Sequence, residues 1–67
     1  MDNVELREAV RMTKARYKIN YKELALRIKC NPSSFYNWLR GEFDFSDKTC
    51  SILEYEMREA IKEVRSY

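Results

Sequence analysis

The chain has 67 residues, of which 36% are charged, and a formal net charge of +2 at neutral pH. This length allows one domain, residues 1–67, with a small core, and it is too short to enclose a deep substrate cleft. The chain contains no histidine, and its two cysteines lie far apart, so we expect no metal site, no cofactor and no catalytic site. No apolar run is long enough to span a membrane and no signal-peptide pattern opens the sequence, so we expect a cytoplasmic protein.

The first expected helix runs from about Val4 to Tyr17, with Asp2 or Asn3 as its N-cap. Apolar residues and one threonine recur there at helical spacing and predict a buried stripe: Leu6, Ala9, Val10, Thr13 and Tyr17.

Two short helices should follow, covering about 21–29 and 32–40. Asn20 is placed to cap the first of them, with Glu23 completing a capping box. Asn31 is placed to cap the second, with Pro32 at its first position, where proline is well tolerated. Gly41 is typical of a helix C-terminus. The residues expected to meet across the turn are Leu24, Ala25, Ile28, Phe35 and Trp38.

The fourth expected helix is long, from Asp47 to about Arg65, and Ser46 is its predicted N-cap. Its apolar stripe consists of Cys50, Leu53, Met57, Ala60, Ile61, Val64 and Tyr67. The first turns should pack on the first and third helices. For the later turns two interpretations stay open: the helix folds fully over the first helix, or it pairs with a second copy of the chain. The dimer interface would then comprise Met57, Ala60, Ile61 and Val64.

Charge is unevenly distributed along the chain. Residues 7–40 carry nine Lys or Arg residues against two Glu, whereas residues 41–67 carry four basic and seven acidic residues. The basic half coincides with the two short helices. Such an asymmetry is typical of a protein with one side facing a polyanion, although solvated helix faces would give the same pattern. Cys30 and Cys50 lie beside predicted helix starts, which favours buried structural thiols over redox chemistry.

Residues 20–41, about a third of the chain, resemble the helix-turn-helix of the lambda-repressor-like (Cro/repressor, or XRE-type) family. The family pattern runs roughly S-Q-E-E-L-A-x-x-L-G-V-S-x-S-x-I-S-x-W-E-x-G. The residues that match it without gaps are Glu23, Leu24, Ala25, Ile28, Asn31, Ser33, Phe35, Trp38 and Gly41. Two positions depart from it. Lys29 replaces the turn glycine, so a lysine is expected at positive φ, and Leu39 replaces the acidic residue that pairs with the first helix.

The resemblance implies that the second short helix enters the DNA major groove. It nominates Ser33 and Asn37 as base contacts, with Pro32 and Tyr36 beside them. Asn37 carries the donor and the acceptor that bind adenine bidentately. The implied phosphate contacts are Tyr21, Lys22, Lys29, Asn31 and Arg40.

We therefore predict an all-α, four-helix domain with a helix-turn-helix and a long C-terminal helix. The expected function is a sequence-specific regulator of transcription that binds double-stranded DNA, as in small Cro-like repressors of phages and mobile elements. It would act as a homodimer that occupies an operator in a bacterial cell or phage-infected host. The alternative is a protein-binding module on the same scaffold, which inhibits or modulates another regulator or an enzyme. Loss of binding at raised salt would distinguish the two.

Overall fold

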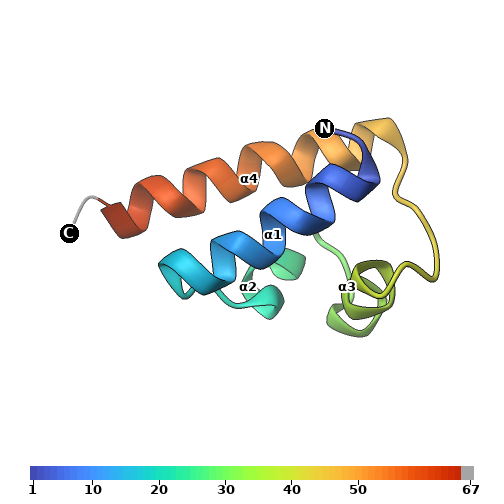
Figure 1. The fold of residues 1–67 in the computed structure, drawn as a ribbon, viewed down its shortest axis with the longest axis horizontal. Helices are drawn as coiled ribbons and strands as arrows, with labels where there is room; N and C mark the ends of the chain where they lie inside the picture. The colour runs from blue at the N-terminus through green and yellow to red at the C-terminus, as the bar shows by residue number, and fades with distance from the viewer. Residues whose placement is uncertain (66–67) are drawn as a thin grey trace.

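The computed structural model describes residues 1–65, which contain four α-helices joined by short connecting segments (Figure 1). The helices are α1 (Asn3–Tyr17), α2 (Tyr21–Arg27), α3 (Pro32–Leu39) and α4 (Asp47–Arg65). The predicted all-α, four-helix architecture is confirmed, and α4 has the predicted bounds. Tyr67, the last residue assigned to the apolar stripe of the fourth helix, lies outside the described residues.

Side-chain caps fix where the helices begin. Asp2 and Glu5 form a complete capping box at α1, whose first helical residue is Asn3. Asn20 Oδ1 accepts from Glu23 N at 2.8 Å, as predicted, but the Glu23 carboxylate does not return the bond. It pairs with Arg27 on the next turn instead, at 3.2 Å. Asn31 caps α3 by accepting from Ser33 N at 2.8 Å, and Ser46 Oγ accepts from Thr49 N at 3.3 Å before α4.

Three residues with positive φ end the first three helices. Lys18 has φ 59°, Lys29 has φ 57° and Gly41 has φ 85°. The turn lysine therefore takes the left-handed conformation expected from the replaced glycine. This conformation also explains why α2 ends at Arg27, two residues before the predicted end, because a helix cannot continue through it. The helix α3 ends at Leu39, with Arg40 as its C-cap.

The long helix α4 runs alongside α1, and the two short helices, α2 and α3, lie below α1 in the view of Figure 1. The most extensive contacts of α4 are with α1, as predicted, and with α2. The six largest fully buried side chains come from all four helices: Leu6, Val10, Leu24, Phe35, Trp38 and Leu53. One core therefore joins the four elements.

The position of α4 corrects part of the predicted dimer interface. Met57 and Ala60 retain only 4% and 1% of their exposure, because α1 and α2 cover this stripe within one chain. They offer no surface to a partner. Ile61 is half-buried and Val64 is 41% exposed, so the remaining accessible apolar surface of the predicted interface lies in the last turns. None of the helices in residues 1–65 combines the length and the apolar character that crossing a lipid bilayer requires.

Candidate nucleic-acid interface

The helix α3 has a buried face and an outer face. Phe35, Trp38 and Leu39 are buried in the core. The four predicted base contacts all belong to this helix, with Ser33 and Tyr36 exposed and Pro32 and Asn37 half-buried. The structure thus brings these four residues together on one short helix, and Tyr36 and Ser33 are accessible to a ligand.

Trp38 anchors the buried face of α3 to the N-terminus of α1. Its ring stacks on Phe45 with centroids 4.7 Å apart, and its Nε1 donates to Asn3 Oδ1 at 2.7 Å. The same Oδ1 accepts from Phe45 N at 2.9 Å, while Asn3 Nδ2 donates to Phe45 O at 3.1 Å. Asn3 was expected only as a possible cap. No sequence signal within its own helix marks this longer-range role.

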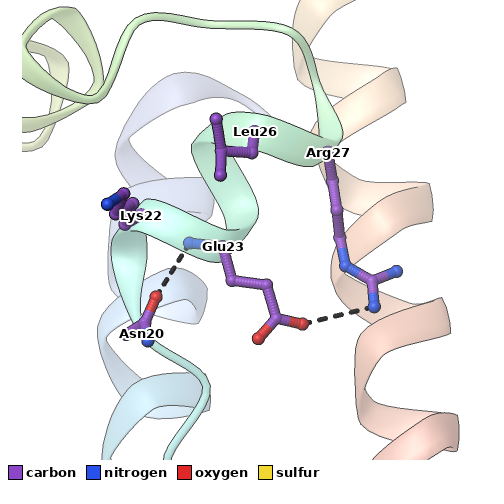
Figure 2. A pocket seen from close by; sticks show the side chains of 5 residues that line it. All are labelled: Asn20, Lys22, Glu23, Leu26 and Arg27. Carbon is purple, nitrogen blue, oxygen red and sulfur yellow. Dashed lines mark hydrogen bonds and ion pairs between the residues drawn. The ribbon is translucent and has the colours of Figure 1, made fainter.

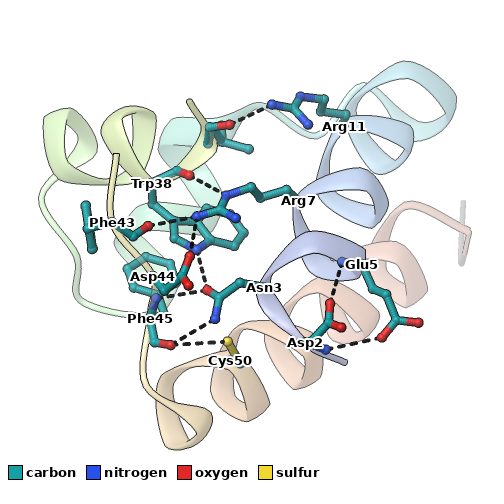
Figure 3. A network of polar contacts seen from close by, with 11 residues as sticks. Asp2, Asn3, Glu5, Arg7, Arg11, Trp38, Phe43, Asp44, Phe45 and Cys50 are labelled. Carbon is teal, nitrogen blue, oxygen red and sulfur yellow. Dashed lines mark hydrogen bonds and ion pairs between the residues drawn. The ribbon is translucent and has the colours of Figure 1, made fainter. Parts of the chain in front are cut away.

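Two arginines of α1 hold the C-terminal end of α3 (Figure 3). Arg7 Nε donates to Trp38 O at 2.6 Å, and its Nη2 reaches Phe43 O and Asp44 Oδ1, both at 2.8 Å. Arg11 Nη2 donates to Leu39 O at 2.6 Å. The last carbonyls of a helix carry partial negative charge and lack partners within the helix, so these cations stabilise its end.

An aromatic surface connects the start of α2 with α3. The ring of Tyr21 meets that of Tyr36 edge to face, with centroids 6.0 Å apart, and it also contacts Phe35. Lys14 Nζ lies 4.4 Å from the centroid of the Tyr21 ring. Tyr21 is half-buried and Tyr36 is 43% exposed. The structure therefore adds Lys14, which the sequence analysis did not nominate, to the surroundings of Tyr21.

The remaining predicted phosphate contacts are exposed, but some of them already bond to other residues of the chain. Lys22, Lys29 and Asn31 are exposed, although Asn31 Oδ1 is occupied as the cap of α3. Arg40 is exposed too, but it forms an ion pair with Glu42 at 2.8 Å and a hydrogen bond with Asn37 Oδ1. Its charge is thus partly neutralised within the chain.

Three of the nine basic residues in 7–40 link one helix to another through hydrogen bonds or ion pairs. Arg7 and Arg11 hold α3, and Arg27 links α2 to α4 through Glu56 and Glu63 while also pairing with Glu23. The hydrogen bond to Glu63 is the main cause that raises the pKa of Arg27 above its ordinary value. A shallow depression lies along α2, lined by Asn20, Lys22, Glu23, Leu26 and Arg27 (Figure 2).

Both cysteines are wholly or partly buried. Cys50 is buried and Cys30 is half-buried, and both thiols are free. Burial raises the pKa of each thiol, which lowers the fraction present as the reactive thiolate.

Comparison of the chain with protein-family models, with curated proteins and with solved structures found no match.

Proposed function

We propose that the chain is a sequence-specific DNA-binding regulator of transcription, with α2 and α3 as a lambda-repressor-like helix-turn-helix. The observation that carries the proposal is the outer face of α3. It presents small polar and aromatic side chains to solvent, while Trp38, Asn3 and the two arginines of α1 fix the opposite face and the end of the helix. A rigidly held helix with such a face has the shape and chemistry that enter a major groove.

The distribution of basic charge in the first half of the chain supports the same proposal. Five basic residues from 14 to 29 form no ion pair with any described residue: Lys14, Arg16, Lys18, Lys22 and Lys29. They come from the end of α1, from α2 and from the turns beside these helices. Cations in such positions attract phosphates without specifying sequence, whereas Asn37 and Ser33 contact bases.

The regulator works by occupying its operator as a homodimer, without any catalytic step, in the cytoplasm of a bacterial cell or phage-infected host. A two-fold dimer places two copies of α3 about one turn of DNA apart, so its operator is an inverted repeat. Small repressors of phages and mobile elements act in this manner, and the resemblance of residues 20–41 to that family underlies this part of the proposal.

Selection of bound fragments from random double-stranded DNA tests the proposal directly. We expect an inverted repeat, and binding that weakens steeply as salt rises because phosphate contacts release counterions. Lys22→Gln should weaken binding to all DNA and reduce the salt slope by about one. Asn37→Ala should cost about 1–3 kcal/mol on the selected site only. Lys62→Gln, which removes the same charge from α4, is the matched control. Failure to enrich any sequence, together with salt-insensitive binding, would refute DNA recognition.

A second candidate is a protein-binding module, and one observation favours it specifically. Leu26 is 60% exposed and lines the depression on α2, where an apolar side chain gains nothing from a phosphate. A partner protein would cover it. If the chain is a protein-binding module, Leu26→Ser should weaken its affinity for the partner protein. If the chain is a DNA-binding regulator, the same substitution should leave its affinity for the operator unchanged.

A further inference from the structure

The chain reverses direction immediately after α3. Gly41 N donates to Trp38 O at 3.0 Å, and Glu42 N donates to Asn37 O at 3.1 Å. This is the hydrogen-bond pattern of a Schellman motif, in which a left-handed residue ends the helix, and Gly41 supplies it with φ 85°. The reversal brings Glu42 beside Asn37, one of the two residues proposed to contact bases.

Arg40 lies between these two side chains. Its Nε donates to Glu42 Oε2 at 2.9 Å, and its Nη2 contacts the same oxygen at 2.8 Å. Nη2 also donates to Asn37 Oδ1. A Schellman motif commonly has an apolar contact between these two positions. Here a polar bridge of three side chains replaces it, and the bridge lies at the end of the outer face of α3.

The bridge changes what Asn37 offers to a base. Its Oδ1 is engaged by the guanidinium group, whereas its Nδ2 donates to no described residue, and the same holds for Nη1 of Arg40. The polar hydrogens of the pair without a described partner therefore outnumber its acceptor sites, because Oδ1 has only one lone pair left beside the bond from Arg40. Adenine needs one donor and one acceptor in the major groove, whereas guanine presents two acceptors, N7 and O6.

We infer that Asn37 and Arg40 act as one donor unit that selects guanine, and that Glu42 is the positioning residue that keeps Arg40 beside Asn37. The inference rests on the proposed docking of α3 in the major groove. It replaces adenine, the partner expected from Asn37 alone, and it turns Arg40 from a phosphate contact into part of the base readout. It also supplies the cation-to-guanine contact that the exposed face of α3 otherwise lacks.

The test compares base preference at one position across three variants. The position is the base pair whose preference disappears in Asn37→Ala. There the wild-type chain should prefer guanine to adenine about ten- to hundred-fold, the discrimination of one good bidentate contact. Arg40→Ala frees Asn37 Oδ1, so the preference should change from guanine to adenine. Circular dichroism verifies that each variant is folded, which the exposure of Arg40 and Glu42 favours.

The Glu42→Gln variant tests the positioning role. Without the carboxylate, Arg40 should leave Asn37 for a nearby phosphate, so guanine preference falls about ten-fold while affinity for random DNA rises. The salt slope should steepen by about 0.9, the value for one added phosphate contact. Glu59→Gln on α4 removes the same charge away from α3 and should change neither quantity.

The failures of the two proposals are distinguishable. A wild-type chain that selects a defined operator but prefers adenine at this position would overturn the donor unit and leave the regulator intact. Unchanged base preference in both Arg40→Ala and Glu42→Gln would overturn it as well. Absence of selection for any DNA would overturn the proposed function, and this inference with it.

Discussion

Asn3 joins α1, α3 and the loop before α4 through one amide side chain. One amide side chain satisfies the indole N–H of Trp38 and both backbone polar groups of Phe45. Trp38 is fully buried, and Asn3 Oδ1 is the acceptor of its N–H among the described residues. A buried polar group without a partner costs more than its hydrogen bond contributed.

We predict that Asn3→Ala lowers the free energy of unfolding by about 1–3 kcal/mol, because Trp38 Nε1 and Phe45 N lose their common acceptor. Chemical denaturation followed by circular dichroism measures the change. Asn3→Asp is the comparison variant, since it keeps an acceptor for Trp38 Nε1 and Phe45 N but replaces the donor to Phe45 O with a negatively charged oxygen. A smaller loss for Asn3→Asp is expected, and equal losses would show that the shared acceptor is not the main contribution.

The amino terminus gives a second prediction at this scale, concerning pH. The Met1 ammonium group lies 3.0 Å from Glu54 Oε1, and their hydrogen bond raises the pKa of the amino group above 8.0 and lowers that of Glu54 below 4.5. The raised amino pKa stabilises the fold below pH 8.0, and this contribution disappears as pH rises through the folded value. The lowered Glu54 pKa stabilises it above pH 4.5, and that contribution disappears as pH falls through the folded value.

Between these two pH limits, acetylation of the amino terminus should lower the melting temperature of the wild-type chain. The decrease should be larger than the one that acetylation causes in the Glu54→Gln variant. The comparison removes the general effect of acetylation on the start of α1. Above the folded pKa of the amino group the difference should vanish. A difference that persists there would show that the ion pair is not its cause.

At the scale of the helices, local chemistry explains why their starts could be predicted and their ends less well. Asn20, Asn31 and Ser46 each bond a backbone N–H two or three residues later, so the signal and its effect lie within one turn. The side chains that hold the end of α3 against the rest of the molecule, in contrast, come from a distant helix. Arg7 and Arg11 hold the end of α3 from about thirty residues away, and nothing in the local sequence of either helix specifies that pairing.

Lys29 carries the backbone strain of the turn between α2 and α3. A side chain at positive φ is costly for a residue with a β-carbon, whereas glycine adopts this conformation freely. Lys29→Gly should therefore raise the free energy of unfolding by up to about 1 kcal/mol. Urea denaturation measures the change. Lys29→Ala removes the charge without relieving the strain and should give no increase, so equal gains in both variants would point to the charge.

At the scale of the whole molecule, α4 was the element whose role the sequence left open. Its stripe continues from Cys50 to Val64, and periodicity alone does not say which partner covers it. The answer depends on where α1 and α2 lie, and they cover Met57 and Ala60. The same limit applied to the site. The face of α3 followed from helical spacing, whereas the bridge of Asn37, Arg40 and Glu42 required the chain reversal at Gly41.

If the protein is a dimer in solution, the exposed last turns of α4 are its remaining predicted contact. Val64→Glu should then weaken self-association and operator binding together without unfolding the monomer, because Val64 is already 41% exposed. Sedimentation at micromolar concentration measures the association state. Tyr55→Glu, at a residue 60% exposed and outside the predicted interface, is the matched control. A wild-type monomer that binds DNA tightly would exclude this dimer.

Trp38 is the only indole in the chain, and it lies where α1, α3 and the loop before α4 meet. The native fluorescence of tryptophan therefore reports on the seating of α3 and not on its outer face. A ligand that docks on a rigid α3 should leave this emission unchanged, even when it binds tightly. A spectral shift during titration would instead reveal that α3 moves against α1, so one optical measurement separates rigid docking from induced fit.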